Sequence, residues 1–236
     1  MGHRAAADSG DDPDRPDGRR NWLYAGAALL VVTSVAVVFE YLPERPGCQP
    51  WLADFASAAG VEGLNRMNDR GGRSTYDFIE GRLEMTARPG SDIGGDIGGE
   101  VTAPFLYTTV SDDFTVQTEV FTDPAVADQA AGLLVFEDAH HYVRLERGFD
   151  DVVAYYGDGE QVTVPASATN VELRLSRHDG QVKAEWRDTP NNGDWQPVGA
   201  PAPVTRAVRV GVMALNTTPD SEPFSATFRY LRITCS

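Results

Sequence analysis

The sequence predicts an all-β domain, a two-sheet antiparallel sandwich, preceded by one transmembrane helix. Two observations predict this fold class. Apolar and polar residues alternate with a period of two along about ten runs after Tyr76, and turn residues separate these runs. An uncharged run of 18 residues, Trp22–Phe39, lies nearer the N-terminus. Because each strand has one apolar face, the sheets must close into a sandwich or a barrel, and we favour the sandwich.

The apolar run predicts a membrane anchor over residues 22–42. About 20 helical residues cross a hydrocarbon core of roughly 30 Å. The run is longer than the core of a cleaved signal peptide, and no A-x-A site follows it. A twin-arginine export signal, read from Arg19 and Arg20, is the alternative. We therefore expect a single-pass protein that binds the lipid bilayer through residues 22–42.

The charges beside the anchor predict its orientation and the division of the chain. Arg19 and Arg20 precede it, whereas Glu40 and Glu44 lie at its other end. Because positive charge stays on the cytoplasmic side, the N-terminus is expected inside and the C-terminal domain outside the cell membrane. Residues 1–21 are expected to be a disordered cytoplasmic tail. Residues 43–75 are expected to form a juxtamembrane segment with a short helix within Pro50–Ala59, and residues 76–236 to form the sandwich.

The charge balance limits the choice of partners. The chain has 35 acidic and 20 basic residues, a formal charge of −15. Six of the acids and four of the bases lie in residues 1–42, which leaves 29 acids, 16 bases and a net charge of −13 for the exported part. A nucleic-acid-binding protein needs a basic face to replace phosphate counterions, so we expect no nucleic-acid partner.

The order of the strand-like runs resembles a known family. The run Ala131–Glu137 followed by His141–Glu146 resembles a hairpin of concanavalin A-like lectin/glucanase domains, most closely an uncharacterised branch akin to the C-terminal domains of β-xylosidases. The runs Val171–Arg177, joined by Asp179-Gly180 to Val182–Trp186, resemble the next strands of that family. The resemblance covers residues 76–233. It implies a jelly roll in which one curved sheet often faces a ligand.

The carboxylates do not match the catalytic pattern of the glucanases in this superfamily. Those enzymes carry acids on alternate positions of one strand, about 5–5.5 Å apart for a retaining mechanism. Glu137 and Asp138 are adjacent and point to opposite faces, and Glu119 has no carboxylate at 117 or 121. We predict no catalytic residues and a protein that is not an enzyme.

Two segments contain residues that often bind metals. His140 and His141 are adjacent, so on a strand they would point to opposite faces, and we expect them in a hairpin turn rather than in a zinc site. The repeat Asp92–Glu100 carries carboxylates that calcium accepts, although a flexible connector is the favoured interpretation. We expect no metal and no cofactor.

One strand face is the candidate ligand-binding surface, with an ordinary solvated sheet face as the alternative. Tyr142, Arg144 and Glu146 point one way, opposite Val143 and Leu145. An aromatic ring beside planar polar groups is typical of a sugar-binding surface. Either Tyr155 or Tyr156 should also face outward. Trp186 is expected in the core. The sequence does not decide whether Trp195 lies in the core or on the surface.

The two cysteines are expected to pair. Cys48 opens the exported region and Cys235 is the penultimate residue. The first and last strands of a sandwich are commonly neighbours, and disulfides persist outside the cytoplasm. We therefore predict a Cys48–Cys235 disulfide.

The predicted function is that of a membrane-anchored, extracytoplasmic binding module whose ligand is a carbohydrate. A structural or protein-interaction module of the cell envelope is the alternative, and a glycoside hydrolase is a third and less favoured hypothesis. The sequence identifies neither the glycan nor an envelope protein partner.

Overall fold

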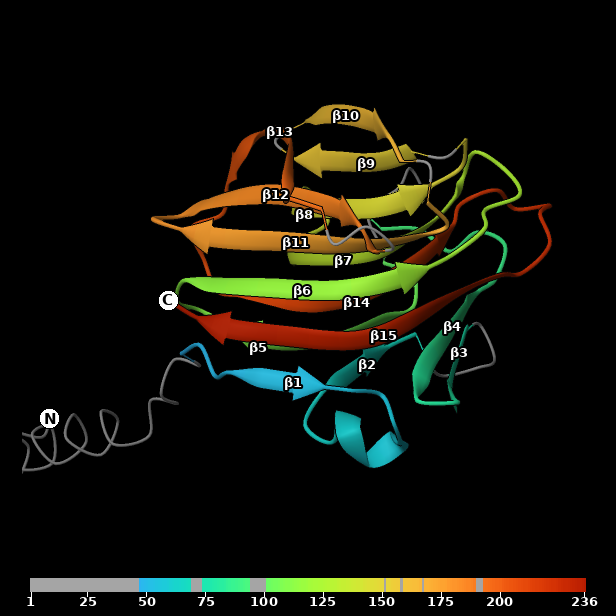
Figure 1. Cartoon of the computed structure of the whole chain (residues 1–236), viewed down its shortest axis with the longest axis horizontal. Helices are drawn as coiled ribbons and strands as arrows, with labels where there is room; N and C mark the ends of the chain where they lie inside the picture. The colour runs from blue at the N-terminus through green and yellow to red at the C-terminus, as the bar shows by residue number, and fades with distance from the viewer. Residues whose placement is uncertain are drawn as a thin grey trace, which may run out of the picture. The chain divides into compact units, whose positions relative to one another are not determined.

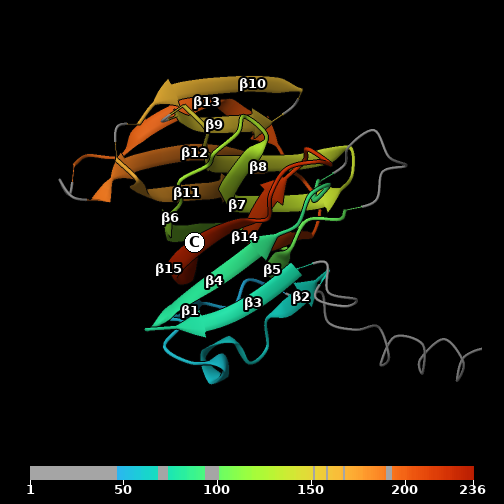
Figure 2. The ribbon, with the colours of Figure 1, turned by 90° about the vertical axis from the view of Figure 1, so that its right-hand side faces the viewer.

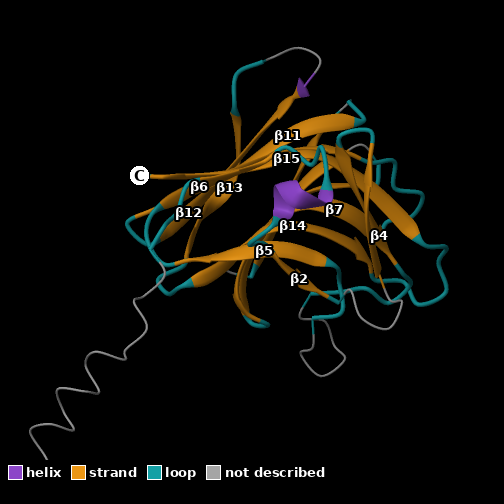
Figure 3. Cartoon of the chain, turned by 90° about the horizontal axis from the view of Figure 1, so that it is seen from below, coloured by secondary structure: helices purple, strands orange, loops and turns teal. Residues whose placement is uncertain are grey.

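The computed structural model describes residues 47–68, 74–93, 101–150, 152–157, 159–166, 168–189 and 193–236. Within these ranges strands predominate, and the 3₁₀ turn η1 (Ala58–Val61) lies near the N-terminal end of the described part (Figure 3). No helix in these ranges is long and apolar enough to cross a membrane. The predicted anchor at 22–42 and the tail at 1–21 lie outside the described residues.

The strands form two antiparallel sheets, and Figure 1 shows β6, β11 and β15 of one sheet in front of β7 and β14 of the other. Sheet A has the order β13 (Gln196–Pro203), β12 (Gln181–Asp188), β11 (Asn170–His178), β6 (Phe114–Phe121), β15 (Phe224–Cys235), β4 (Arg82–Ala87), β3 (Ser74–Ile79), with β1 (Trp51–Ala53) also paired to β15. Sheet B has the order β10 (Glu160–Pro165), β9 (Val152–Gly157), β8 (His141–Gly148), β7 (Gln129–Asp138), β14 (Val208–Asn216), β5 (Phe105–Val110), β2 (Asn65–Met67). Figure 2 shows β10 and β13 together on one side, far from β2 and β3. The predicted two-sheet antiparallel sandwich is confirmed.

The core lies between the sheets and follows the predicted alternation. Leu173 and Leu175 of β11 are fully buried. Val143 and Leu145 of β8 are at most 1% exposed. Trp186 is also buried in this core, as predicted. Because successive strand residues point to opposite faces, each apolar residue that packs inward places its two neighbours on the outer face.

The β11–β12 hairpin turns at the predicted Asp-Gly pair. Asp179 and Gly180 have φ angles of +49° and +72°. Both central residues of a type I′ turn need positive φ, which asparagine, aspartate and glycine tolerate best. The turn therefore fixes the register in which Arg174 lies opposite Glu185.

The segment before residue 76 belongs to the sandwich and does not lie outside it. Residues 51–53 form β1 on β15, and residues 65–67 form β2 on β5. The predicted short helix within Pro50–Ala59 is therefore wrong at its start, since Trp51 begins a strand and η1 begins only at Ala58. A helix of a few residues is marginal alone, whereas pairing with β15 satisfies the backbone of β1 and buries Ala53.

The predicted disulfide is present and joins the first described strand region to the last strand. The Cα atoms of Cys48 and Cys235 are 5.6 Å apart, and 187 positions separate them in sequence. The Cys48 backbone N–H also donates to Asp112 Oδ2 at 3.3 Å. The bridge thus closes a loop that contains nearly the whole sandwich.

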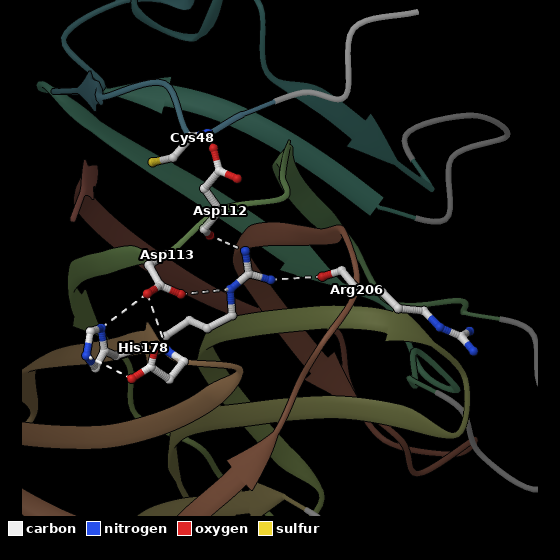
Figure 4. Close-up of polar contacts among 7 residues, drawn as sticks. Cys48, Asp112, Asp113, His178 and Arg206 are labelled. Atoms are coloured by element: carbon white, nitrogen blue, oxygen red, sulfur yellow. Dashed lines mark hydrogen bonds and ion pairs between the residues drawn. The ribbon is translucent and has the colours of Figure 1, made fainter. Parts of the chain in front are cut away.

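Buried Arg177 ties together the loops near this disulfide, and Figure 4 labels its partners Asp112, Asp113 and Arg206. Its side chain is only 3% exposed and follows Leu175 on the core-facing side of β11. It donates to the Arg206 carbonyl at 2.8 Å and to the Asp112 carbonyl, and it lies 4.0 Å from Asp113 Oδ1. These bonds close the end of the sandwich at which β6 begins and β11 ends.

Removing the disulfide should destabilise the fold without changing it. For a loop of this length, the chain-entropy model gives an upper estimate of about 5 kcal/mol for the loss in unfolding free energy of the Cys48→Ala/Cys235→Ala variant. Denaturant titration of both proteins measures the loss, and near-UV circular dichroism checks that the native packing remains. Equal stability of the variant and the oxidised parent would contradict this role of the bridge.

Candidate functional site

Strand β8 places Tyr142, Arg144 and Glu146 together on the outer face of sheet B. Val143 and Leu145 between them face the core. The three side chains nevertheless differ in environment. Tyr142 is partly exposed, whereas Arg144 and Glu146 are buried, with side-chain exposures of 11% and 4%. The candidate ligand face is therefore only partly open to solvent.

The two charged residues form an ion pair beneath the surface. Arg144 Nε lies 2.9 Å from Glu146 Oε2. Beyond this pair, neither atom has a hydrogen-bond partner among the described residues. Gly132 lies opposite Glu146 on β7, and a Cβ there would stand 2.1 Å from the Leu145 carbonyl oxygen and 2.7 Å from Glu146 Cα. Glycine at 132 therefore allows β7 and β8 to approach closely beside the pair.

A second apolar cluster lies on the same outer face of sheet B. Two residues from the described ends of the segment after β4, Ile93 and Ala103, belong to it. These residues pack on the following buried side chains of the sheet: Phe105, Leu134, Phe136, Met213 and Leu215. The Ser91–Asn216 bridge and two backbone bonds to the Asp92 carbonyl hold the segment in place. The residues between Ile93 and Val101 lie outside the described part, so the predicted connector and its calcium alternative at 92–100 remain predictions.

Burial changes the acidity of Glu146. Loss of solvent raises the pKa of this carboxyl to about 7, the Arg144 guanidinium opposes the rise, and the nearby Asp92 carboxylate adds to it. Burial also raises the pKa of the Tyr156 hydroxyl, and the Glu146 charge raises it further. The net charge of the Arg144–Glu146 pair therefore changes with pH close to neutrality.

Tyr156 connects the ion pair to the surface. The Arg144 guanidinium carbon lies 3.9 Å from the centroid of the Tyr156 ring, within the range of a cation–π contact. Gln161 Nε2 donates to the Tyr156 hydroxyl at 3.0 Å. The neighbouring Tyr155 instead faces the core and donates to the Ala200 carbonyl at 2.8 Å. Tyr156 is therefore the outward-facing residue of the tyrosine pair.

An open pocket of about 690 Å³ lies beside Tyr142 and Tyr156. Its wall comes from the turns after β7 and β9, from the starts of β8 and β10, and from the end of β13. The polar side chains in this wall include His140, His141, Glu160 and Gln161. Of the three predicted ligand residues, only Tyr142 lines this pocket. The sequence identified Tyr156 only as one of two candidates and did not identify Glu160 or Gln161.

His140 lies in the β7–β8 turn, where the pair was expected, and His141 begins β8 directly after it. Asp138 Oδ1 accepts the backbone N–H groups of His140 and His141 at 2.8 and 3.0 Å, and it lies 2.9 Å from His141 Nδ1. These bonds hold the pKa of Asp138 below its usual value. Ligand atoms of Glu137, Asp138 and His141 lie within 4.8 Å of one another, although the carboxylates already cap the turn or pair with Arg206.

Trp195 lies on the other sheet, away from this pocket. Its ring centroid is 4.1 Å from the Arg174 guanidinium carbon and 4.6 Å from that of Arg187. Arg174 pairs with Glu185 at 2.8 Å, and Arg187 pairs with Glu172. The ring therefore belongs to a layer of paired charges on the outer face of sheet A.

A family model matches residues 74–235, which is most of the sandwich. The chain belongs to the DUF1349 family. The description of this family is "protein of unknown function". A search of curated proteins gave no match.

Solved structures similar to this family member confirm the concanavalin A-like sandwich. A functionally unknown protein from Saccharomyces cerevisiae is 19% identical with a TM-score of 0.61, over 75% of this chain and 98% of that one. A xylan β-1,4-xylosidase from Bacillus halodurans is 18% identical with a TM-score of 0.61, over 82% of this chain but only 41% of that enzyme. Lectin I-B4 from Griffonia simplicifolia, in a metal-free form, is 8% identical with a TM-score of 0.54, over 80% of this chain and all of that one. At these identities the likeness shows the fold alone.

The raised pKa of Glu146 predicts a stability that depends on pH. A carboxyl whose pKa is higher in the folded state stabilises the fold fully below its unfolded pKa of about 4.5, and this contribution is lost as the pH rises through about 7. As the pH rises through this range, the unfolding free energy of wild type should fall by up to about 3 kcal/mol relative to that of the Glu146→Gln variant. Glutamine keeps the shape of the side chain but cannot ionise. Chemical denaturation of both proteins across this pH range measures the difference. Parallel pH profiles would show that Glu146 has an ordinary pKa.

Proposed function

We propose that this protein is a carbohydrate-binding module and that its ligand occupies the pocket beside Tyr142 and Tyr156. The observation that carries the proposal is the pocket itself, in which two tyrosines stand among polar side chains at an open end of sheet B. Sugars present apolar C–H faces and hydroxyl edges. Aromatic rings pack against the former, and amide, imidazole and carboxylate groups hydrogen-bond the latter.

The contacts around Tyr156 support a preformed site. Arg144 lies against the ring, and Gln161 bonds the hydroxyl, so the ring loses little freedom when a ligand binds. Arg144 is in turn fixed by Glu146. A ring that is positioned before binding raises affinity, because less conformational entropy is lost on association.

The role of Glu146 supports binding rather than hydrolysis. A glycosidase of the usual kind needs two carboxyl groups on either side of the scissile bond. Glu146 is the carboxylate on the β8 face, and it is buried, paired with Arg144 and absent from the pocket wall. The neighbours that carry enzyme names match this chain over less than half of their length, so their activity does not transfer with the fold.

We also propose that residues 22–42 anchor this module in the cell membrane with the sandwich outside. The uncharged run and the two preceding arginines support this topology. The Cys48–Cys235 disulfide also supports it, because disulfides persist in oxidising compartments.

A structural or protein-interaction role in the cell envelope is the second candidate. The paired charges on the outer face of sheet A favour it, since Glu172, Glu185 and Glu119 each face an arginine there. Such a surface is neutral in an otherwise acidic domain and suits contact with another protein. Glycan binding that depends on the pocket would decide against it.

Replacing the pocket tyrosines should abolish glycan binding. Because the rings supply the apolar contact, Tyr142→Ala and Tyr156→Ala should each weaken binding at least about tenfold on a glycan array, with affinities then measured by calorimetry. Tyr230→Ala, which removes a tyrosine from the outer face of sheet A, is the matched control and should bind as wild type does. Unchanged binding by folded Tyr142→Ala and Tyr156→Ala variants would place the ligand elsewhere.

The proposed anchor should keep the full-length chain in the membrane. Expression in a bacterial host should give a product of full mass that resists carbonate extraction, because a spanning helix is not removed by high pH. The Lys183 residue of the sandwich should be labelled by a membrane-impermeant amine reagent in intact spheroplasts. A soluble product that begins after residue 40 would contradict the anchor.

A further inference from the structure

The charges around the pocket bear on which saccharide it accepts. Among the described residues of its wall, Glu160 is the one carboxylate, and no lysine or arginine is present. Glu160 is exposed at the first position of β10, next to Gln161, which holds Tyr156. An exposed carboxylate in this position is available to a ligand.

The cations near the pocket are already paired. His141 lines the pocket, but its Nδ1 lies 2.9 Å from the Asp138 carboxylate, so a positive charge on the ring would be matched. Arg144 contacts Tyr156 and lies 2.9 Å from Glu146, and it is absent from the pocket wall. Arg206, near the same turn, pairs with Glu137 at 3.2 Å. Apart from the exposed imidazole of His140, the described side chains of the pocket wall offer an anionic ligand no uncommitted positive partner.

Two tyrosine rings and a carboxylate form a set that favours positive charge. The face of an aromatic ring is electron-rich and attracts a cation, and the Arg144 guanidinium already occupies one face of Tyr156 in this way. The chain after residue 42 has a net charge of −13, and the electrostatic field of this charge also attracts positively charged ligands over long range. From these features we infer that the pocket is selective for amino sugars, with Glu160 as the partner of the ligand's ammonium group, and that it rejects uronic acids.

This inference rests on the proposed carbohydrate-binding function and adds the chemical class of the ligand. It separates three tetrasaccharides that differ in charge, of which the glucosamine and glucose tetramers also share the β-1,4 linkage and the ring configuration. Tetramers of β-1,4-linked glucosamine, β-1,4-linked glucose and α-1,4-linked galacturonic acid are cationic, neutral and anionic at about pH 6. The order of affinity should be glucosamine, then glucose, then galacturonate.

The expected effects are modest, because Glu160 is exposed to solvent. An exposed ion pair of this kind changes an affinity by about two- to fivefold. Calorimetric titration with the full chain should show the glucosamine tetramer binding tighter than cellotetraose by this factor. The advantage should shrink when NaCl is raised from about 0.05 M to about 1 M, because salt screens exposed charges.

The substitution Glu160→Gln tests the assignment of the partner. It should remove the advantage of the glucosamine tetramer and leave the affinity for cellotetraose unchanged. Glu80→Gln is the matched control, since it removes the same charge at the exposed β3–β4 turn and lies outside the pocket wall. This control should keep the wild-type order of affinities.

The possible results separate the inference from the function on which it rests. Equal binding of the cationic and neutral tetramers, or a Glu160→Gln variant that still favours glucosamine, would overturn the inference and leave carbohydrate binding intact. Tighter binding of the galacturonate tetramer would also overturn it. Binding of none of the three tetramers would count against the proposed function and the inference together.

Discussion

The alternation of side chains along β8 is the constraint on which the candidate site depends. Val143 and Leu145 must face the core, so Arg144 and Glu146 must face the opposite side of sheet B. The chain packs Ile93 and Ala103 on that side of the sheet, and the neighbouring Asp92 is close enough to raise the pKa of Glu146. Two buried charges are tolerable only as a pair. The pair in turn holds Tyr156, which lines the pocket at this end of the sandwich.

The pocket and the disulfide share one end of the sandwich. Arg206 links them, because its carbonyl accepts from buried Arg177 while its guanidinium pairs with Glu137, just before the turn that precedes His141. Cys48 joins the same set of contacts through Asp112. The loops that line the pocket are therefore supported by a cross-linked base, which suits a site that must keep its shape when it is empty.

Much of the fold could be predicted from the sequence, because its signals are local. Alternation identified the core residues of β11 and β12, Asp179-Gly180 identified their turn, and the terminal positions of the cysteines identified the disulfide. Burial of Arg144 and Glu146 could not be predicted, since the residues packed on that side of sheet B, Ile93 and Ala103, come from a distant part of the chain. The same is true of β1, whose pairing depends on the part of β15 that extends beyond its pairing with β4. One signal was available but unused: Arg177 continues the core-facing series of Leu173 and Leu175, and a charge in that series indicates a buried structural arginine.

The central claim is that ligands meet this fold at the β8–β10 end of sheet B. The measurement that tests it most directly is a set of ¹H–¹⁵N NMR spectra recorded while glucosamine tetramer is added. The account predicts that shift changes concentrate on the backbone amides of residues 139–143, Tyr156 and Gln161. Changes centred on Arg174, Arg187 and Trp195 would place the ligand on sheet A and contradict the account.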